Sequence, residues 1–121
     1  MPAKTEPKSG LQWGWNLGED GWNIGTDANW LKLGRFGFHL SVIDRNVTDP
    51  STLTPANGDT YIVATSAVGA WAGWDGRVVV WDADAAVWVS AVPKTGWLAY
   101  IEDEQVLSAY KPAGWSVGVA I

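Results

Sequence analysis

Turn-forming residues recur so closely after residue 35 that this part of the chain can form only short elements. Two neighbouring segments show the pattern most clearly, RVVVWDADAAVWVSAVPKTGW (77–97) and WLAYIEDEQVLSAYKPAGW (97–115). Each contains a strand, an acidic turn, a second strand and a Pro/Gly turn that ends in Trp. Short strands at regular spacing are typical of small sandwiches and barrels. The pattern therefore predicts a mainly β fold, a small antiparallel β-meander arranged as a sandwich or an open barrel.

The expected strands follow from the same signals. Apolar residues alternate over 36–43, which predicts a first strand. Six more are expected at 61–64, 77–81, 86–90, 97–101, 106–110 and 115–121. Pro, Ser, Thr and an Asn-Gly pair crowd residues 44–59, which predicts a long loop with turns. We therefore expect residues 36–121 to form one β domain.

The N-terminal third differs from the rest of the chain in composition. Residues 1–10 mix three charges with two prolines and contain no hydrophobic stretch, so we expect a flexible, extended arm and no secretory signal. Residues 11–35 are dense in Trp and Gly and are interpreted as an attachment segment. A short helix is expected to start at Thr26 or Asp27, both good N-cap residues, and to end at Gly34.

Composition excludes several classes of protein. The 121 residues are enough for one domain, and they include no cysteine, which excludes disulfides, zinc fingers, iron–sulfur clusters and thiol catalysis. The net charge of −5 disfavours binding to nucleic acid. No apolar run approaches the roughly 18 residues that cross a membrane. We therefore expect a protein that is made and kept in a cytoplasm, unless it leaves by lysis or inside a particle.

The residues that could carry chemistry form no convincing constellation. Glu102-Asp103-Glu104 is interpreted as a solvated hairpin turn. Asp82-x-Asp84 lacks the glycine and the closing glutamate of a calcium loop. The only histidine, His39, has no partner at a recognisable spacing, and no Gly-x-Ser-x-Gly elbow is present. We expect no catalytic residue, no metal site, no cofactor and no enzymatic activity, and we keep cleavage of cell-wall glycan only as a third hypothesis.

Ten tryptophans are the feature of composition that needs an explanation. They could fill a thin core, form a protein interface, or stack on sugar rings. Four are assigned mainly to the β core by their places in strands or after turns: Trp81, Trp88, Trp97 and Trp115. Four belong to the N-terminal segment and either pack on the β domain or, as we favour, bind another chain: Trp13, Trp15, Trp22 and Trp30. Trp71 and Trp74 are expected to be the most exposed pair, a surface for a ligand or partner, although a folded-back turn fits equally.

The β region resembles a domain family of unknown function that is encoded in tailed-phage, prophage and gene-transfer-agent virion loci. The matching positions are Gly58-Asp59-x-Tyr61-Ile62-Val63, Gly69-Ala70-Trp71-Ala72-Gly73, Val80-Trp81-Asp82, Trp88, Pro93, Gly96-Trp97, Tyr110 and Gly114-Trp115. The upstream stretch GWNLGEDGWNIGTDANWLKLGRFGFHLSV is similar to a module that opens many phage tail and tail-fibre proteins. It departs from that module at Thr26, where Met is usual, and at Trp30, where Leu is usual.

The resemblance implies a virion structural protein and supplies no catalytic residues. We expect a tail-fibre, appendage or adaptor subunit that docks through its N-terminal segment onto other phage virion proteins of the tail, neck or capsid. The alternatives are a capsid decoration or head-fibre protein, and a module that binds host surface glycan through exposed Trp. Analogy with phage appendages implies a homo-oligomer, a trimer, located in the virion.

Overall fold

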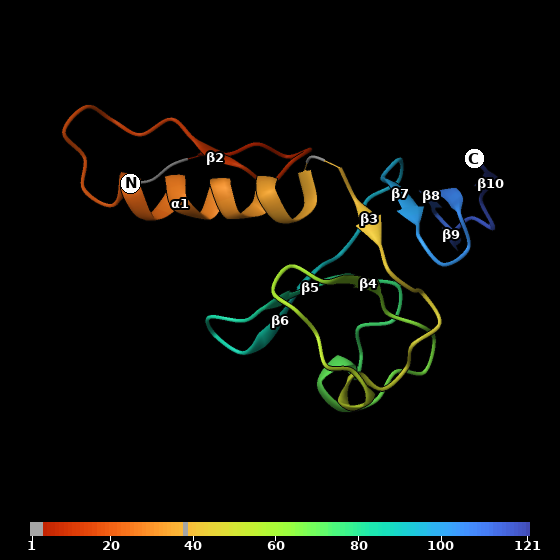
Figure 1. Cartoon of the computed structure of the whole chain (residues 1–121). Coiled ribbons are helices and arrows are strands. Elements are labelled where there is room, and N and C mark those ends of the chain that lie inside the picture. The colour runs from red at the N-terminus through yellow and green to blue at the C-terminus, as the bar shows by residue number, and fades with distance from the viewer. Residues whose placement is uncertain (1–3, 38) are drawn as a thin grey trace. The chain divides into compact units, whose positions relative to one another are not determined.

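The structure is a computed structural model that describes residues 4–37 and 39–121. The chain divides into two compact units, residues 1–38 and residues 39–121, and each is described by itself (Figure 1). The described residues form ten strands in three sheets and one α-helix, without a closed barrel. The expectation of a small, mainly β protein with a short N-terminal helix is thus confirmed.

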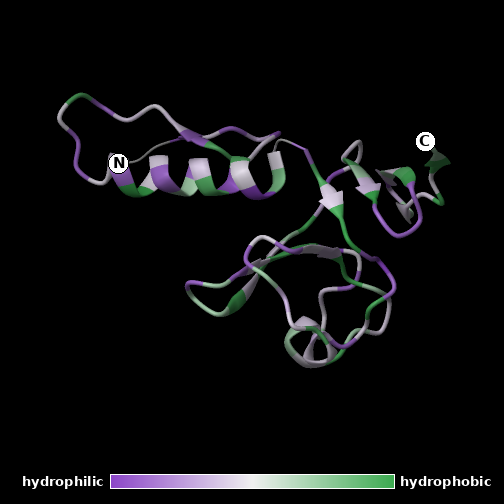
Figure 2. Ribbon diagram, viewed as in Figure 1, coloured by the Kyte–Doolittle hydropathy of each residue, from purple (hydrophilic) through white to green (hydrophobic). Residues whose placement is uncertain are grey.

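The N-terminal unit is a helix beside a short two-stranded ribbon (Figure 1). Strand β1 (Lys4–Thr5) pairs antiparallel with β2 (Gln12–Trp13), so this part of the expected arm has regular structure. Helix α1 spans Trp22–Lys32 and continues into a π-helical turn, η1 (Leu33–Gly37). Apolar and polar residues alternate around α1 rather than separating into two faces (Figure 2).

Several boundaries expected from the sequence are wrong, among them the last strand, expected over 115–121, which is divided into β9 (Gly114–Trp115) and β10 (Val119–Ala120). The helix begins at Trp22 and not at Thr26 or Asp27, because Gly21 adopts a left-handed conformation (φ 86°) and starts the helix without a side-chain cap. The strand expected over 36–43 shrinks to β3 (Ser41–Val42), since the helical turn extends to Gly37. Phe38, which is part of the expected alternation, lies outside the described residues.

The β unit contains two sheets. The three-stranded sheet has the order β4 (Thr60–Ile62), β5 (Val78–Asp82), β6 (Val87–Ala91), all antiparallel. The five-stranded sheet consists of β3, β7 (Leu98–Ile101), β8 (Val106–Lys111), β9 (Gly114–Trp115) and β10 (Val119–Ala120). Two 3₁₀ turns, η2 (Pro50–Thr52) and η3 (Gly69–Trp71), lie in the connections before and after β4.

The two hairpins that look alike in sequence also turn alike. In each, the residue before the second strand is left-handed, Ala86 with φ 55° and Gln105 with φ 56°. They nevertheless belong to different sheets, β5–β6 to one and β7–β8 to the other. Strand β3 moreover pairs parallel with β7. The expected purely antiparallel meander is therefore wrong in detail, because hairpin signals are local whereas sheet membership depends on long-range pairing.

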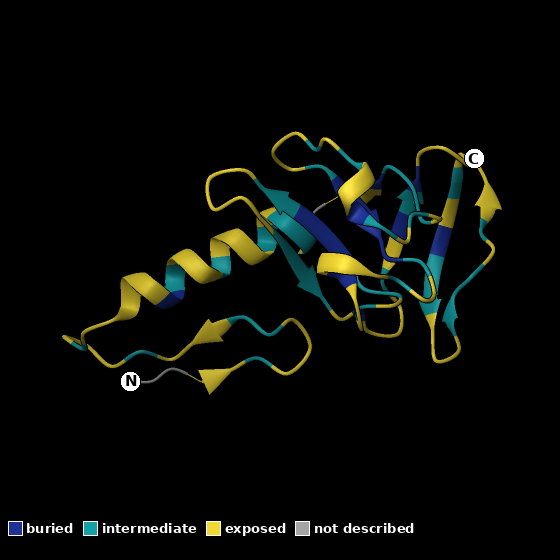
Figure 3. Ribbon diagram, turned by 90° about the horizontal axis from the view of Figure 1, so that it is seen from below, coloured by how far each residue is buried: buried dark blue, intermediate teal, exposed yellow. Residues whose placement is uncertain are grey.

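The core lies within the β unit, where Figure 3 shows the buried residues concentrated along the strands. Three consecutive residues of β5, Val78, Val79 and Val80, are buried, so both faces of this strand are covered. Two residues of the other sheet, Val42 and Ile101, are paired across β3–β7 and are also fully buried. This continuous Val/Ile burial explains why β5 lacks the polar-out alternation of a surface strand.

Candidate functional site

The N-terminal unit exposes most of its large apolar side chains. Trp13 is 52%, Trp22 57% and Trp30 65% exposed, whereas Trp15 is half-buried. We call the exposed set the N-terminal apolar surface; its members are Trp13, Leu17, Trp22, Ile24, Trp30 and Leu31. Within α1 only Gly25 is buried. Three of the four tryptophans assigned to attachment thus stand at the surface.

Polar contacts to backbone hold this unit together in place of a large core. The Asn29 side chain of α1 accepts from the Gln12 N–H (2.8 Å) and donates to the Gln12 carbonyl (2.8 Å). One turn later, Lys32 Nζ donates to the Gly10 carbonyl (3.3 Å). The Trp15 indole packs against Gly25, which explains why that helical position carries no side chain. Helix and ribbon are therefore joined along one helix face, at positions i, i+4 and i+7.

Replacement of Gly25 by Ala should open this junction. A Cβ there would lie 2.9 Å from Trp15 Cη2 and 3.0 Å from Gln12 Oε1, so the indole must move. We expect a loss of about 1–3 kcal/mol in local stability, read as faster amide hydrogen exchange at Gln12 and Asn29. The matched control is Gly34→Ala, where nothing lies within 4 Å and exchange should slow slightly. Equal exchange in both variants would contradict the packing.

The structure corrects the expectation that Trp71 and Trp74 form an exposed pair. Trp71 is 0% exposed, because the η3 turn folds its indole against Tyr61 (centroids 5.8 Å) and Trp88 (5.1 Å). Trp74 is half-buried, packs against the same cluster, and has the Arg77 guanidinium 5.8 Å from its ring centroid. The folded-back turn, the alternative of equal weight, describes this segment, and Trp71 cannot offer a face to a sugar.

The Asp75 side chain stabilises the same turn through hydrogen bonds to its backbone. Its carboxylate accepts from the backbone N–H groups of Ser66 (2.9 Å) and Ala67 (3.2 Å). These two bonds lower the pKa of the Asp75 carboxyl below its ordinary value, since they stabilise the charged form. Asp75 thus acts as a local structural cap for a segment in which Ser66 is left-handed (φ 66°).

The tryptophans assigned to the β core are half-buried and contact other elements. Trp81 and Trp88 face each other across β5–β6 with centroids 5.0 Å apart. Trp115 packs edge-on against Tyr110 (5.2 Å), and its Nε1 donates to the Gly76 carbonyl (2.9 Å). Trp115 therefore ties β9 to the turn that precedes β5, a structural role consistent with its assignment to the core.

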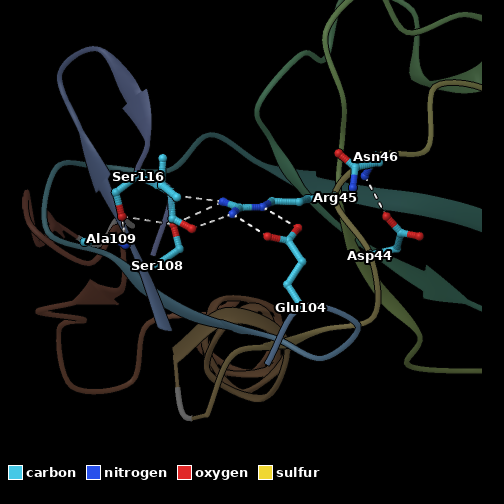
Figure 4. A network of polar contacts seen from close by, with 8 residues as sticks. Asp44, Arg45, Asn46, Glu104, Ser108, Ala109 and Ser116 are labelled. Atoms are coloured by element: carbon cyan, nitrogen blue, oxygen red, sulfur yellow. Dashed lines mark hydrogen bonds and ion pairs between the residues drawn. The ribbon is translucent and has the colours of Figure 1, made fainter. Parts of the chain in front are cut away.

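The most connected polar group is Arg45, which the sequence places in an apparent loop (Figure 4). Its guanidinium binds the Glu104 carboxylate through two bonds, Nε to Oε2 (2.8 Å) and Nη2 to Oε1 (2.7 Å). The same group donates to the Ser116 carbonyl (2.8 Å) and the Val117 carbonyl (2.8 Å). Arg45 thus joins the segment after β3, the β7–β8 turn and the connection between β9 and β10.

The connection between β9 and β10 interrupts the pairing along β8. Strands β9 and β10 pair with different halves of β8, and between them the Ser116 hydroxyl accepts from the Ala109 N–H (3.0 Å) in place of a backbone carbonyl. The fully buried Ser108 hydroxyl donates to the Ser116 carbonyl (2.7 Å). We call the set Arg45, Glu104, Ser108, Ser116 and Val117 the Arg45 network. It satisfies the backbone groups that the interruption leaves without ladder partners.

Two carboxyl groups of the turn that the sequence suggested to be simply solvated, Glu104 and Asp103, have shifted pKa values. Hydrogen bonding from Arg45 lowers the pKa of Glu104. Partial desolvation, with the nearby Asp44 charge, raises the pKa of Asp103. Sequence reasoning missed Arg45 and Glu104 because their positions are 59 residues apart. The only signals in the sequence were an arginine in a predicted loop and a separate acidic turn, and no local pattern places the two side by side.

The described residues contain no group of three or more His, Cys, Asp and Glu side chains that could hold a metal ion. His39 is exposed. No helix in the described part of the chain is long and apolar enough to cross a membrane. The polar arrangement of Figure 4 is saturated by its own hydrogen bonds, so its chemistry is that of a structural clamp.

Fold and site together define a small, mainly β protein with an apolar N-terminal helical unit. The chain belongs to the family described as "Protein of unknown function (DUF2793)", whose model matches residues 36–116. No curated protein and no solved structure matches the chain. The match covers most of the β unit and ends before β10, and it agrees with the resemblance found from the sequence as far as an uncharacterised domain family.

Proposed function

We propose that this chain is a structural subunit of a phage particle, a tail-fibre, appendage or adaptor protein that docks through its N-terminal apolar surface. The observation that carries the proposal is the exposure of six large apolar side chains on a unit whose helix buries only Gly25. Exposed tryptophan side chains are enriched at protein–protein interfaces. The phage context comes from the resemblance described for the sequence.

The amount of exposed indole is consistent with an interface. Each of Trp13, Trp22 and Trp30 leaves more than half of its side chain in water, or about 100 Å². A standard protein interface buries about 800 Å² per partner, so the three indoles supply over a third of it. Tryptophan is also among the residues that contribute most to binding when a partner covers it.

The glycan-binding alternative loses support, because it relied on Trp71 and Trp74 at the surface and the Trp71 side chain is fully buried. The capsid decoration alternative uses the same N-terminal apolar surface. It differs only in which virion protein is bound and is therefore an outcome of the same experiment.

The proposal predicts that the chain is present in purified particles and that the N-terminal apolar surface attaches it. Mass spectrometry of particles from a producing strain should detect the wild-type chain. The Trp22→Ser/Trp30→Ser variant should be at least ten-fold depleted from particles, which corresponds to a loss of at least ~1.4 kcal/mol in binding, while remaining folded by circular dichroism.

The matched control is Leu98→Ser, which changes an exposed apolar residue of the β unit and should incorporate normally. A chain absent from particles would overturn the proposed function. Normal incorporation of the double Trp variant would overturn the assignment of the attachment surface. A density map of the particle then separates tail, neck and capsid placement.

A further inference from the structure

Strand β6 is an open edge of the three-stranded sheet. The Trp81 N–H of β5 donates to the Asp59 carbonyl (2.9 Å) on the β4 side. Alternation then directs the neighbouring residues of β5 towards β6, where Val80 pairs with Val89. The backbone groups of Trp88 and Ser90 therefore point away from β5. Of the described residues, none pairs with this outer edge.

The edge carries none of the usual protection against strand pairing. Residues 87–92, VWVSAV, contain no charge, proline or glycine, whereas natural edge strands are normally blunted by such residues. The opposite edge of the same sheet is covered: the Ile43 N–H donates to the Thr60 carbonyl (2.8 Å), and the Ala64 N–H to the Val47 carbonyl (3.2 Å). The contrast marks β6 as the edge able to accept another strand.

We propose that β6 pairs antiparallel with β6 of a second copy of this chain, across a two-fold axis at Val89. In this register Trp88 lies opposite Ser90 of the second copy, and each such pair exchanges two backbone hydrogen bonds. The two three-stranded sheets become one continuous sheet. The pairing goes beyond the proposed function and does not depend on what the N-terminal unit binds.

Charge and size favour a second copy as the occupant. The register that centres on Val89 places only uncharged residues of the two strands opposite one another, since residues 87–92 carry no charge. Two chains of net charge −5 repel each other, so an uncharged strand is the part of the surface that suits self-pairing. Trp88 also faces a small residue, Ser90, and Val89 faces itself, which are compatible cross-strand pairs.

A single introduced cysteine reports the register directly, because the natural chain has none. Across a non-hydrogen-bonded antiparallel pair the Cα atoms are about 4.5 Å apart, within disulfide range. Val89→Cys should therefore form a covalent dimer on mild oxidation. In the matched control, Val87→Cys, the two sulfurs belong to residues four positions out of register, about 13 Å apart, and cross-linking should be at least ten-fold slower.

Solution mass tests the dimer itself. Light scattering of the full chain should give twice 13.0 kDa. Ser90→Pro removes an N–H that β5 does not use and should weaken the dimer at least ten-fold. Ser90→Ala, which loses only the hydroxyl that accepts from Arg77 (3.3 Å), should remain dimeric.

Three results would overturn the proposal: a monomeric or trimeric wild type, a Ser90→Pro variant that dimerises as well as Ser90→Ala, or faster cross-linking at position 87 than at 89. If Ser90→Pro fails to fold by circular dichroism, the mass of the wild type and the two cysteine variants still decide. Because every one of these measurements uses the isolated chain, a failure here leaves the particle experiment untouched.

Discussion

Replacement of Trp71 by Ala should cost about 3–5 kcal/mol of unfolding free energy, the range for removing a large aromatic side chain from a core. Trp71 is fully buried and contacts Tyr61 and Trp88 with ring centroids 5.8 and 5.1 Å away. The cavity would adjoin Val63 and Val79, which belong to the same cluster. Since small domains have only about 5–15 kcal/mol in total, the loss is a large part of the stability. Urea unfolding followed by far-UV circular dichroism measures it.

Two further variants sharpen this prediction. Trp30→Ala, at a side chain 65% exposed, should leave the free energy of unfolding of the β unit unchanged within about 0.5 kcal/mol. Trp71→Phe should cost clearly less than Trp71→Ala, because it keeps a ring and removes an indole N–H that has no hydrogen-bond partner among the described residues. A Trp71→Ala variant as stable as wild type would contradict the assignment of Trp71 to the core.

The second large effect is expected at Arg45. Arg45→Met keeps the apolar stem but removes donors from Glu104, from the Ser116 carbonyl and from the Val117 carbonyl. Glu104 and Val117 are exposed, so the loss comes mainly from the part-buried bond to the Ser116 carbonyl and should cost about 1–3 kcal/mol in unfolding free energy. The matched control is Lys111→Met on β8, an exposed cation whose loss should change stability by less than about 0.5 kcal/mol. Equal urea midpoints for the two variants would refute the clamp.

The unfolding free energy should also depend on pH through the Arg45–Glu104 pair. Folding lowers the Glu104 pKa below its ordinary 4.5, because Arg45 bonds the charged form. As pH falls below about 4.5 the unfolded chain binds the proton first, so the unfolding free energy decreases. Asp49 and Asp75, whose pKa values are also lowered, act in the same direction, whereas Asp103, with a raised pKa, opposes it.

Glu104→Gln isolates the contribution of the pair. Its unfolding free energy should fall less steeply than that of wild type between about pH 4.5 and pH 3, while the slopes due to Asp49 and Asp75 persist. Urea titrations at several pH values measure the difference. Identical slopes for Glu104→Gln and wild type would show that the Glu104 pKa is not lowered by folding. The double variant with Arg45→Met should lose less than the sum of the single losses, because both act on one network.

The hairpins were the part of the fold most accessible to sequence reasoning. The expected strands at 77–81, 86–90, 97–101 and 106–110 lie within one residue of β5, β6, β7 and β8. Alternating apolar residues and turn chemistry act over a few residues, so they are visible in a linear chain. The start of α1 was missed because a left-handed Gly21, a residue normally interpreted as a breaker, begins the helix without a polar cap.

The candidate sites likewise include features that local sequence indicated and features that it did not. Trp13, Trp22 and Trp30 are exposed in a Gly-rich segment that has few residues with which to cover an indole, and the expectation that they bind another chain stays a prediction. The burial of Trp71 did not follow from sequence, because it depends on Tyr61 and Trp88, which lie on two different strands. No local pattern distinguishes a tryptophan in an open turn from one in a turn folded onto a sheet.

By itself, the sequence determined the mainly β class, the pairing within each hairpin and the distinct apolar N-terminal segment, since each depends on neighbours along the chain. Only the tertiary structure decided that the two hairpins belong to separate sheets, that Arg45 clamps Glu104 and the break between β9 and β10, and that β6 remains an open edge. The physical reason is that sheet order, ion pairs across 59 residues and unpaired edges are properties of long-range pairing. Composition and turn signals restrict such pairings but do not choose among them.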